Sequence, residues 1–164
     1  MPEHVLFEER QRMSPTITFW GLAFTLLVLG GSALLVARQG KLAEAGPVLL
    51  ASGLAVTAVF LFVGSTTLVT RVTLEQAVVA FRPFKTLTLL PGDIASVTMK
   101  TFGMFDGGVG YHIGFRSMAL TASTGSGVLV TRPDGYRILI GTQRPDALMS
   151  ALIQLQRAAT KAAW

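Results

Sequence analysis

The chain has 164 residues, of which 51% are hydrophobic and 14% are charged, and its formal net charge is +5. Ordinary soluble domains carry about 25% charged residues, so the composition indicates a membrane protein. The absence of cysteine excludes a disulfide framework and a thiolate metal site. In such a chain the positive charge points to anionic lipid or to topology signals, and no nucleic-acid partner is expected.

Two long apolar segments predict a transmembrane hairpin over residues 16–66, after an N-terminal tail over 1–15. The helices are expected over 16–38 and 45–65, and each is long enough to cross a hydrocarbon core of about 30 Å. The short polar link between them, with Gly40 as a helix stop, makes the two helices neighbours. A cleaved signal peptide is the alternative for the first segment, but the apolar stretch is too long for one.

The uncharged runs 16–37 and 45–63 contain no acidic, basic or histidine residue, which proton relays and ion pathways usually need. A transporter or pump is therefore not expected, whereas an oligomeric pore lined by hydroxyl groups stays open. Gly30, Gly31 and Ala33 would let helices approach closely, either within the hairpin or between copies of the chain. Packing within the hairpin is the favoured alternative.

Lysine and arginine near the span ends set the expected orientation. The connecting loop carries Arg38 and Lys41. The opposite side carries Arg10, Arg12, Arg71, Arg82 and Lys85. This balance predicts a multi-pass protein of the cell inner membrane with both termini in the cytoplasm.

Residues 67–160 change character and predict an α+β domain with about seven strands before a helix. Strand-like stretches lie at 68–74, 77–81, 85–90, 94–100, 111–115 with 118–122 (one broken strand or two), 127–131 and 136–141. The sequence Pro133-Asp134-Gly135 predicts a tight turn between the last two. Because no helices intervene, a parallel sheet built from βαβ units is excluded.

The final segment predicts one amphipathic helix of about four turns, with Pro145 and Asp146 at its start. Leu148, Leu152 and Leu155 share one stripe, which must be buried, and the open end of a bent antiparallel sheet is the expected partner. The residues expected to face away are Gln154, Gln156, Arg157 and Lys161.

The segments PGDIASVTM, GGVGYHIGF and SGVLVTRPDGYRILIGTQRPDALMSALI resemble membrane-anchored bacterial pleckstrin-homology-like (PH-like) domain proteins. In that family a two-span hairpin precedes the barrel, and a motif like the one from Asp134 to Leu148 joins the last strand to the helix. The resemblance covers residues 66–157 and implies a PH-like antiparallel β-barrel capped by a C-terminal helix. It brings no catalytic residue and no cofactor. The loop Glu75-Gln76 has no basic residue, so inositol-phosphate recognition is not supported.

The stretch TFGMFDGGVGYHIGFR over 101–116 contains a glycine pattern one residue away from a dinucleotide fingerprint. A strand-like segment follows it, whereas such a site needs a helix N-terminus, so nucleotide binding is not expected. Catalysis by His112 with Asp106 or Ser117 has a plainer alternative, a half-exposed histidine on a strand. The two histidines His4 and His112 are too few for a metal site.

The candidate contacts for a partner or the membrane fall into an apolar loop and a set of basic residues. They are Phe102, Met104, Phe105, Arg82, Lys85 and Arg71. Apolar loop residues pack over the barrel, against lipid or against a protein. The basic residues either lie in a solvated turn or contact anionic head groups. Strand 111–115 could also accept an added peptide strand at a sheet edge.

These patterns predict a non-enzymatic, membrane-anchored PH-like module that binds a protein partner or acts as a scaffold at the cytoplasmic membrane face. A small homo-oligomeric membrane subunit or channel-like accessory protein is the alternative. An enzyme using His112, Asp106 or Arg116 is a third hypothesis. The expected partners are the lipid bilayer and a protein of unknown identity, with homo-oligomers left open, and no cofactor, metal or catalytic residue is expected.

Overall fold

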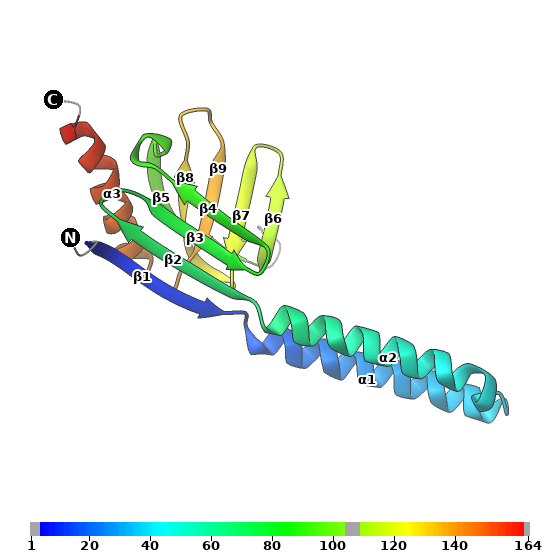
Figure 1. The fold of residues 1–164 in the computed structure, drawn as a ribbon. Coiled ribbons are helices and arrows are strands. Elements are labelled where there is room, and N and C mark those ends of the chain that lie inside the picture. The colour runs from blue at the N-terminus through cyan, green and yellow to red at the C-terminus, as the bar shows by residue number, and fades with distance from the viewer. Residues whose placement is uncertain (1–3, 104–108, 163–164) are drawn as a thin grey trace. The chain divides into compact units, whose positions relative to one another are not determined.

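The computed structural model describes residues 4–103 and 109–162, which divide into two compact units. One unit is the helical segment Ser14–Ser65, and the other combines the chain before it with the chain after it. The prediction of a tail over residues 1–15 is wrong, because Val5–Arg12 forms strand β1 of the second unit (Figure 1). That unit therefore begins before the helices and continues after them.

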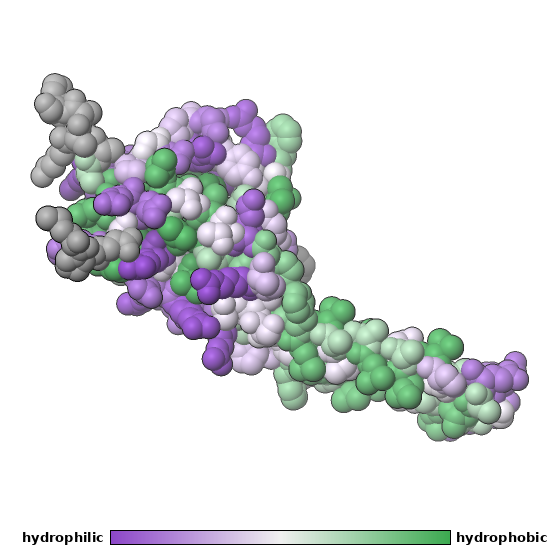
Figure 2. Space-filling view, viewed as in Figure 1, coloured by the Kyte–Doolittle hydropathy of each residue, from purple (hydrophilic) through white to green (hydrophobic). Residues whose placement is uncertain are grey.

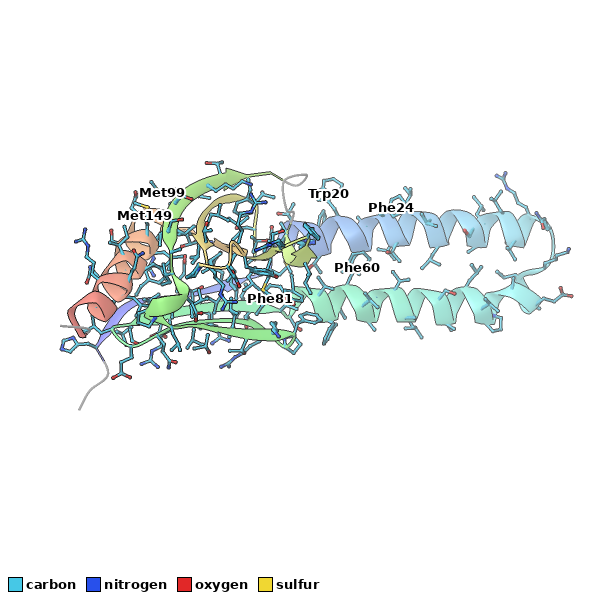
Figure 3. All side chains as sticks on the ribbon, turned by 90° about the horizontal axis from the view of Figure 1, so that it is seen from above. Trp20, Phe24, Phe60, Phe81, Met99 and Met149 are labelled. Atoms are coloured by element: carbon cyan, nitrogen blue, oxygen red, sulfur yellow. The ribbon has the colours of Figure 1, made fainter. Side chains whose placement is uncertain are left out.

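The first unit is the predicted pair of long apolar helices, α1 (Pro15–Arg38) and α2 (Leu42–Gly64). Helix α2 begins three residues before the predicted start at 45. Gly40, with φ of +70°, lies in the link between the helices, where a residue with a side chain would be strained. Phe60 points toward α1 and packs on Gly21, whereas Trp20 and Phe24 point away from α2 (Figure 3).

Both helices are long and apolar enough to cross a membrane, over Thr18–Arg38 and Leu42–Gly64. Only 6% of the first apolar window and 0% of the second is buried within the protein. Apolar side chains consequently dominate the face of this unit that Figure 2 shows. The core helix of a soluble protein would bury its apolar face, so this surface is typical of helices that lipid surrounds.

The second unit contains two separate sheets. Sheet A is antiparallel in the order β1-β2-β3-β4, with β2 (Thr67–Thr73), β3 (Ala77–Arg82) and β4 (Lys85–Leu89). A short 3₁₀ helix, η1 (Pro91–Asp93), follows at the predicted Pro-Gly-Asp turn. Buried and more exposed side chains alternate along most of β1 and β2, as in a sheet with one buried face.

Sheet B has the order β5-β8-β9-β7-β6. Its strands are β5 (Ser96–Phe102), β6 (Gly110–Gly114), β7 (Ser117–Thr121), β8 (Gly125–Thr131) and β9 (Arg137–Gly141). The described residues hold nine strands in two sheets and no closed barrel, so the α+β class with a C-terminal helix is confirmed, whereas the barrel of about seven strands stays a prediction. The pair β7–β9 is parallel, because β8 lies between them in sequence and carries the chain back.

Helix α3 (Pro145–Ala162) begins at the predicted proline and packs against β5, η1, β2, β8 and β1. Leu148, Leu152 and Leu155 are 0% exposed, so the prediction that this stripe is buried is confirmed. The other large, fully buried side chains of the core come from both sheets: Leu68, Val72, Val79, Leu89, Leu120, Val128, Val130, Ile138 and Ile140. Gln156 does not simply face away, since it donates hydrogen bonds to the carbonyls of Ile94 and Ala95.

Polar side chains attach β1 to the end of β9 and to the segment that leads from β9 to α3. The carboxylate of Glu9 accepts hydrogen bonds from the Thr142 hydroxyl at 2.5 Å and from the Gln143 backbone N–H at 3.1 Å. Gln11 donates to the carbonyl of Gly141 at 2.9 Å. The Arg144 guanidinium lies 4.9 Å from the centre of the Phe7 ring. Because Glu9 and Gln11 are polar although they face inward, β1 lacks the alternation of apolar and polar residues that indicates a strand. This explains why the sequence predicted a tail.

Candidate functional site

The outer face of sheet A becomes basic at the end where the strands adjoin the helices in sequence. The register aligns Arg12 of β1 with Thr67 of β2, and Thr67 with Arg82 of β3. All three point away from the core, because their neighbours along each strand are buried. Adjacent strands are about 4.8 Å apart, so the backbones of Arg12 and Arg82, which are two strands apart in this row, lie roughly 10 Å from each other.

The turn between β3 and β4 adds a third cation and an aromatic ring to this end of the sheet. Lys85 is exposed, and Phe84 is 52% exposed although its ring stacks on buried Phe81, with 5.8 Å between ring centres. Among the described residues, no acidic side chain forms an ion pair with Arg12, Arg82 or Lys85. We call Arg12, Arg82 and Lys85 the basic end.

Arg71 belongs to a different part of the same face. Its Nε lies 4.0 Å from a carboxylate oxygen of Glu8, which is directly opposite it in the register of β1 and β2. A groove of about 470 Å³ follows this face, and its walls are Glu8, Val69, Arg71, Thr73, Gln76, Val78, Ala80 and Arg82. The structure therefore brings predicted contact residues Arg71 and Arg82 to one groove, while Lys85 lies at the turn beside it.

The apolar loop residues do not form the expected contact surface in the described part of the chain. Phe102 is 3% exposed and packs with Ala119 and Leu139, which corrects its assignment as a partner or membrane contact. The burial of Phe102 agrees with the alternative in which this residue packs over the domain. Met104 and Phe105 lie outside the described residues.

An apolar patch lies instead at the turn between β6 and β7. Ile113 is 69% exposed and Phe115 is 93% exposed. Strand β6 is at the edge of sheet B, as predicted for the stretch 111–115. Phe115 directly precedes the turn residue Arg116, whose φ is +53°, an unusual conformation for a residue with a side chain that local sequence does not indicate.

The residues of the enzyme hypothesis have structural contacts where they are described. His112 Nε2 lies 3.0 Å from the Val109 carbonyl oxygen, and its side chain is exposed on β6 as the plainer alternative expects. Arg116 donates to the carbonyl of Asp134. Asp106 lies outside the described residues. In the same described segments, no group of three histidine or acidic residues could hold a metal ion.

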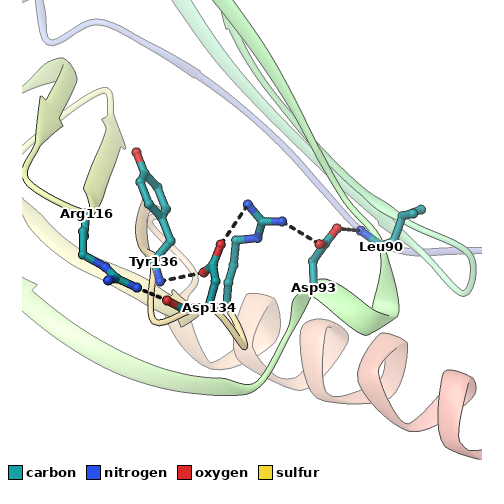
Figure 4. Close-up of polar contacts among 6 residues, drawn as sticks. Leu90, Asp93, Arg116, Asp134 and Tyr136 are labelled. Carbon is teal, nitrogen blue, oxygen red and sulfur yellow. Dashed lines mark hydrogen bonds and ion pairs between the residues drawn. The ribbon is translucent and has the colours of Figure 1, made fainter.

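A chain of polar contacts connects η1 with the β8–β9 turn (Figure 4). Asp93 accepts the Leu90 backbone N–H at 3.0 Å and the Arg132 guanidinium at 2.9 Å, and Arg132 also lies 3.7 Å from Asp134. The Leu90 hydrogen bond lowers the pKa of Asp93, an effect that partial burial opposes and Arg132 reinforces. Because every acceptor in this chain already holds a donor, we assign it a structural role.

Glycines in the helical unit divide into packed and open positions. A side chain at Gly21 would collide with Phe60, and one at Gly53 would collide with Leu29. Gly30 and Gly31 meet no atom within 4 Å, so they do not support packing within the hairpin, contrary to the favoured alternative. An apolar groove of about 440 Å³ along the two helices includes Gly30, Ala33, Gly46 and Gly53 in its walls.

Comparison of the chain with protein-family models, with curated proteins and with solved structures gives no match.

Proposed function

We propose that the chain is a non-enzymatic, membrane-anchored module whose two apolar helices hold an α+β domain at the cytoplasmic face of the inner membrane. The domain binds a protein partner or acts as a scaffold there. The observation that carries this proposal is that the unburied helices interrupt one sheet: β1 comes before them and its hydrogen-bonded neighbour β2 comes after them. The PH-like resemblance belongs to the same proposal, supported by two sheets with a helix packed against them.

Strand β1 also argues that α1 is retained. Phe7 and Gln11 on β1 are 5% and 4% exposed, and β1 precedes α1 in the chain. Cleavage of α1 as a signal peptide would remove this strand and expose the inner face of β2. A retained hairpin keeps both strands on one side of the membrane, as the proposed cytoplasmic domain requires.

The edge of sheet B is the proposed protein-binding surface. Strand β6 offers backbone hydrogen-bonding groups at the sheet edge, and Ile113 and Phe115 provide apolar area beside them. An extended peptide that pairs with such an edge gains main-chain hydrogen bonds and places alternate side chains on the apolar groups. Exposed aromatic anchors of this kind dominate many protein interfaces.

The open glycine positions favour a second candidate, a small homo-oligomeric membrane subunit. Gly30 and Gly31 leave the surface of α1 accessible to another helix, and small residues support such helix pairs in lipid. Cross-linking within membranes separates the candidates. Defined span-to-span products between copies favour the subunit, whereas products with another protein through the domain favour the module.

A direct test places a photo-crosslinking amino acid at Phe115 in the full-length protein, with Arg157 on the exposed side of α3 as the control position. The proposal expects a discrete protein adduct from position 115 that an Ile113→Asp substitution removes. Alkaline extraction of the same membranes should leave the chain in the pellet. Release of the chain, or identical adducts at both positions, would contradict the proposal.

A further inference from the structure

We infer that the basic end, together with Phe84, binds the phosphate groups of anionic lipids in the bilayer that anchors the chain. This inference assumes the proposed membrane anchoring and adds a surface that recognises lipid charge. Its residues are Arg12, Arg82 and Lys85, of which Arg12 comes to this position only through the register of β1 with β2.

The connections between the basic end and the apolar helices are short in sequence. Arg12 is three residues before the first residue of α1, and Thr67 is three residues after the last residue of α2. Three residues of extended chain reach about 10 Å at most, which is close to a Debye length at physiological salt. The pair Arg12–Thr67 is therefore held within electrostatic range of the head groups, and Arg82 is one strand further along the same row.

Charge along sheet A changes with distance from that end. The acidic residues Glu8 and Glu75 lie toward the far end, where Glu8 is paired with Arg71. Glu8 is four residues from Arg12, or about 13 Å along the strand. The sheet thus presents uncompensated cations nearest to the helices and compensated charge further away, as a surface that meets an anionic layer would.

The side chains suit a lipid phosphate. Guanidinium groups bind phosphate oxygens through paired hydrogen bonds, and lysine adds a compact charge. Phe84 lies between Arg82 and Lys85 in the sequence of the turn, and its ring is half-exposed although it stacks on Phe81. The interfacial region of a membrane accepts such aromatic rings. Each basic residue near an anionic membrane is expected to strengthen the contact about fivefold, which corresponds to about 1 kcal/mol.

The test uses the full-length chain in nanodiscs and exploits the absence of cysteine, which makes a single introduced thiol the only labelling site. A fluorophore on Thr86→Cys reports beside the basic end, and one on Leu74→Cys reports at the far end of the same sheet. Head-group spin labels on phosphatidylglycerol and on phosphatidylcholine quench each fluorophore. The ratio of the two quenching efficiencies measures the local preference for anionic lipid.

We expect a ratio of about five or more at position 86, a ratio near one at position 74, and a fall of the first value in high salt. The triple variant R12Q/R82Q/K85Q should bring the ratio at position 86 to about one. The matched control K100Q/R137Q/R157Q removes the same charge from exposed positions elsewhere and should keep it. Hydrogen exchange of β2 and β3 checks that both variants stay folded.

Equal ratios at the two positions, an unchanged ratio in the triple variant, or an equal loss in the matched control would overturn the inference. Loss of the ratio when inorganic phosphate replaces chloride at equal ionic strength would assign the surface to free phosphate and overturn it as well. Alkaline extraction of the wild-type chain distinguishes the two proposals. Release from membranes refutes the anchoring, whereas retention with a ratio of one refutes only the lipid contact.

Discussion

Replacing Glu9 with alanine should weaken the attachment of β1 to the rest of its unit. The Glu9 carboxylate accepts the Thr142 hydroxyl and the Gln143 N–H, and the residue is only 9% exposed. Hydrogen bonds to charged groups contribute about 1.5–3 kcal/mol each, and the substitution leaves both donors without their acceptor. Because the two bonds share one carboxylate, we expect a total loss of about 2–4 kcal/mol rather than their sum.

Hydrogen exchange of the full-length chain in nanodiscs measures this loss locally. Amides of β1 that exchange through opening of the strand should exchange about 30- to 700-fold faster in Glu9→Ala, since each 1.4 kcal/mol is tenfold. Glu9→Gln keeps an acceptor for the Gln143 N–H and should lose less.

The neighbouring glutamate provides the matched control. Glu8 points outward, its side chain is 62% exposed, and its ion pair with Arg71 spans 4.0 Å. An exposed pair of this kind contributes about 0–1 kcal/mol, so Glu8→Ala should change β1 exchange less than about fivefold. Equal acceleration by the two alanine substitutions, or a wild-type β1 that exchanges without protection, would refute the reasoning.

Three further substitutions test the core, the polar contacts and the hairpin. Leu152→Ala should lower the free energy of unfolding in micelles by about 2–5 kcal/mol, because the side chain is fully buried, whereas Gln154→Ala should change it little. The pKa of Asp93 is lowered because the folded state stabilises its carboxylate, and this stabilisation is fully present above the ordinary pKa of 3.8. It is lost as the pH falls below that value, because the unfolded chain binds the proton more readily. Denaturation at pH 5 and pH 3 should therefore show a smaller pH effect for Asp93→Asn than for wild type. Gly21→Leu should destabilise the hairpin by about 1–3 kcal/mol, and Gly31→Leu, at an open position, should not.

The parts that sequence predicted well are those where one period dominates a long segment. The long uncharged runs predicted both apolar helices, and the stripe of Leu148, Leu152 and Leu155 predicted which face of α3 is buried. The Pro-Asp-Gly turn before β9 also follows from local chemistry, with Gly135 at φ of +80°.

Strand β1 could not be predicted because its inward positions are partly polar. Glu9 and Gln11 read as solvent-facing residues until their partners, Thr142 and the Gly141 carbonyl, are brought close by the fold. Those partners are separated by 133 and 130 residues, so no local pattern contains them. Tertiary context overrides local preference in such a strand.

The candidate site was predicted in part. Arg82 and Lys85 could be predicted as contact residues from their charge alone, whereas Arg12 is brought into one row with Arg82 only by the register of the strands. Phe102 was misassigned because an apolar residue next to glycines resembles an exposed loop tip, whereas it ends β5 and turns inward. Local sequence does not encode which of two neighbouring positions faces the core when a strand ends.

The interruption of one sheet by the helices has a consequence for biogenesis. During translation β1 leaves the ribosome first, yet its partner β2 is synthesised only after both apolar helices. Under the proposed anchoring, β1 must wait unpaired while the hairpin enters the bilayer, and the sheet closes only when the second helix has returned the chain to the starting side. An inverted or half-inserted hairpin would leave β1 and β2 in different compartments, where they could not pair. Under this proposal the sheet forms only when the hairpin has been inserted correctly.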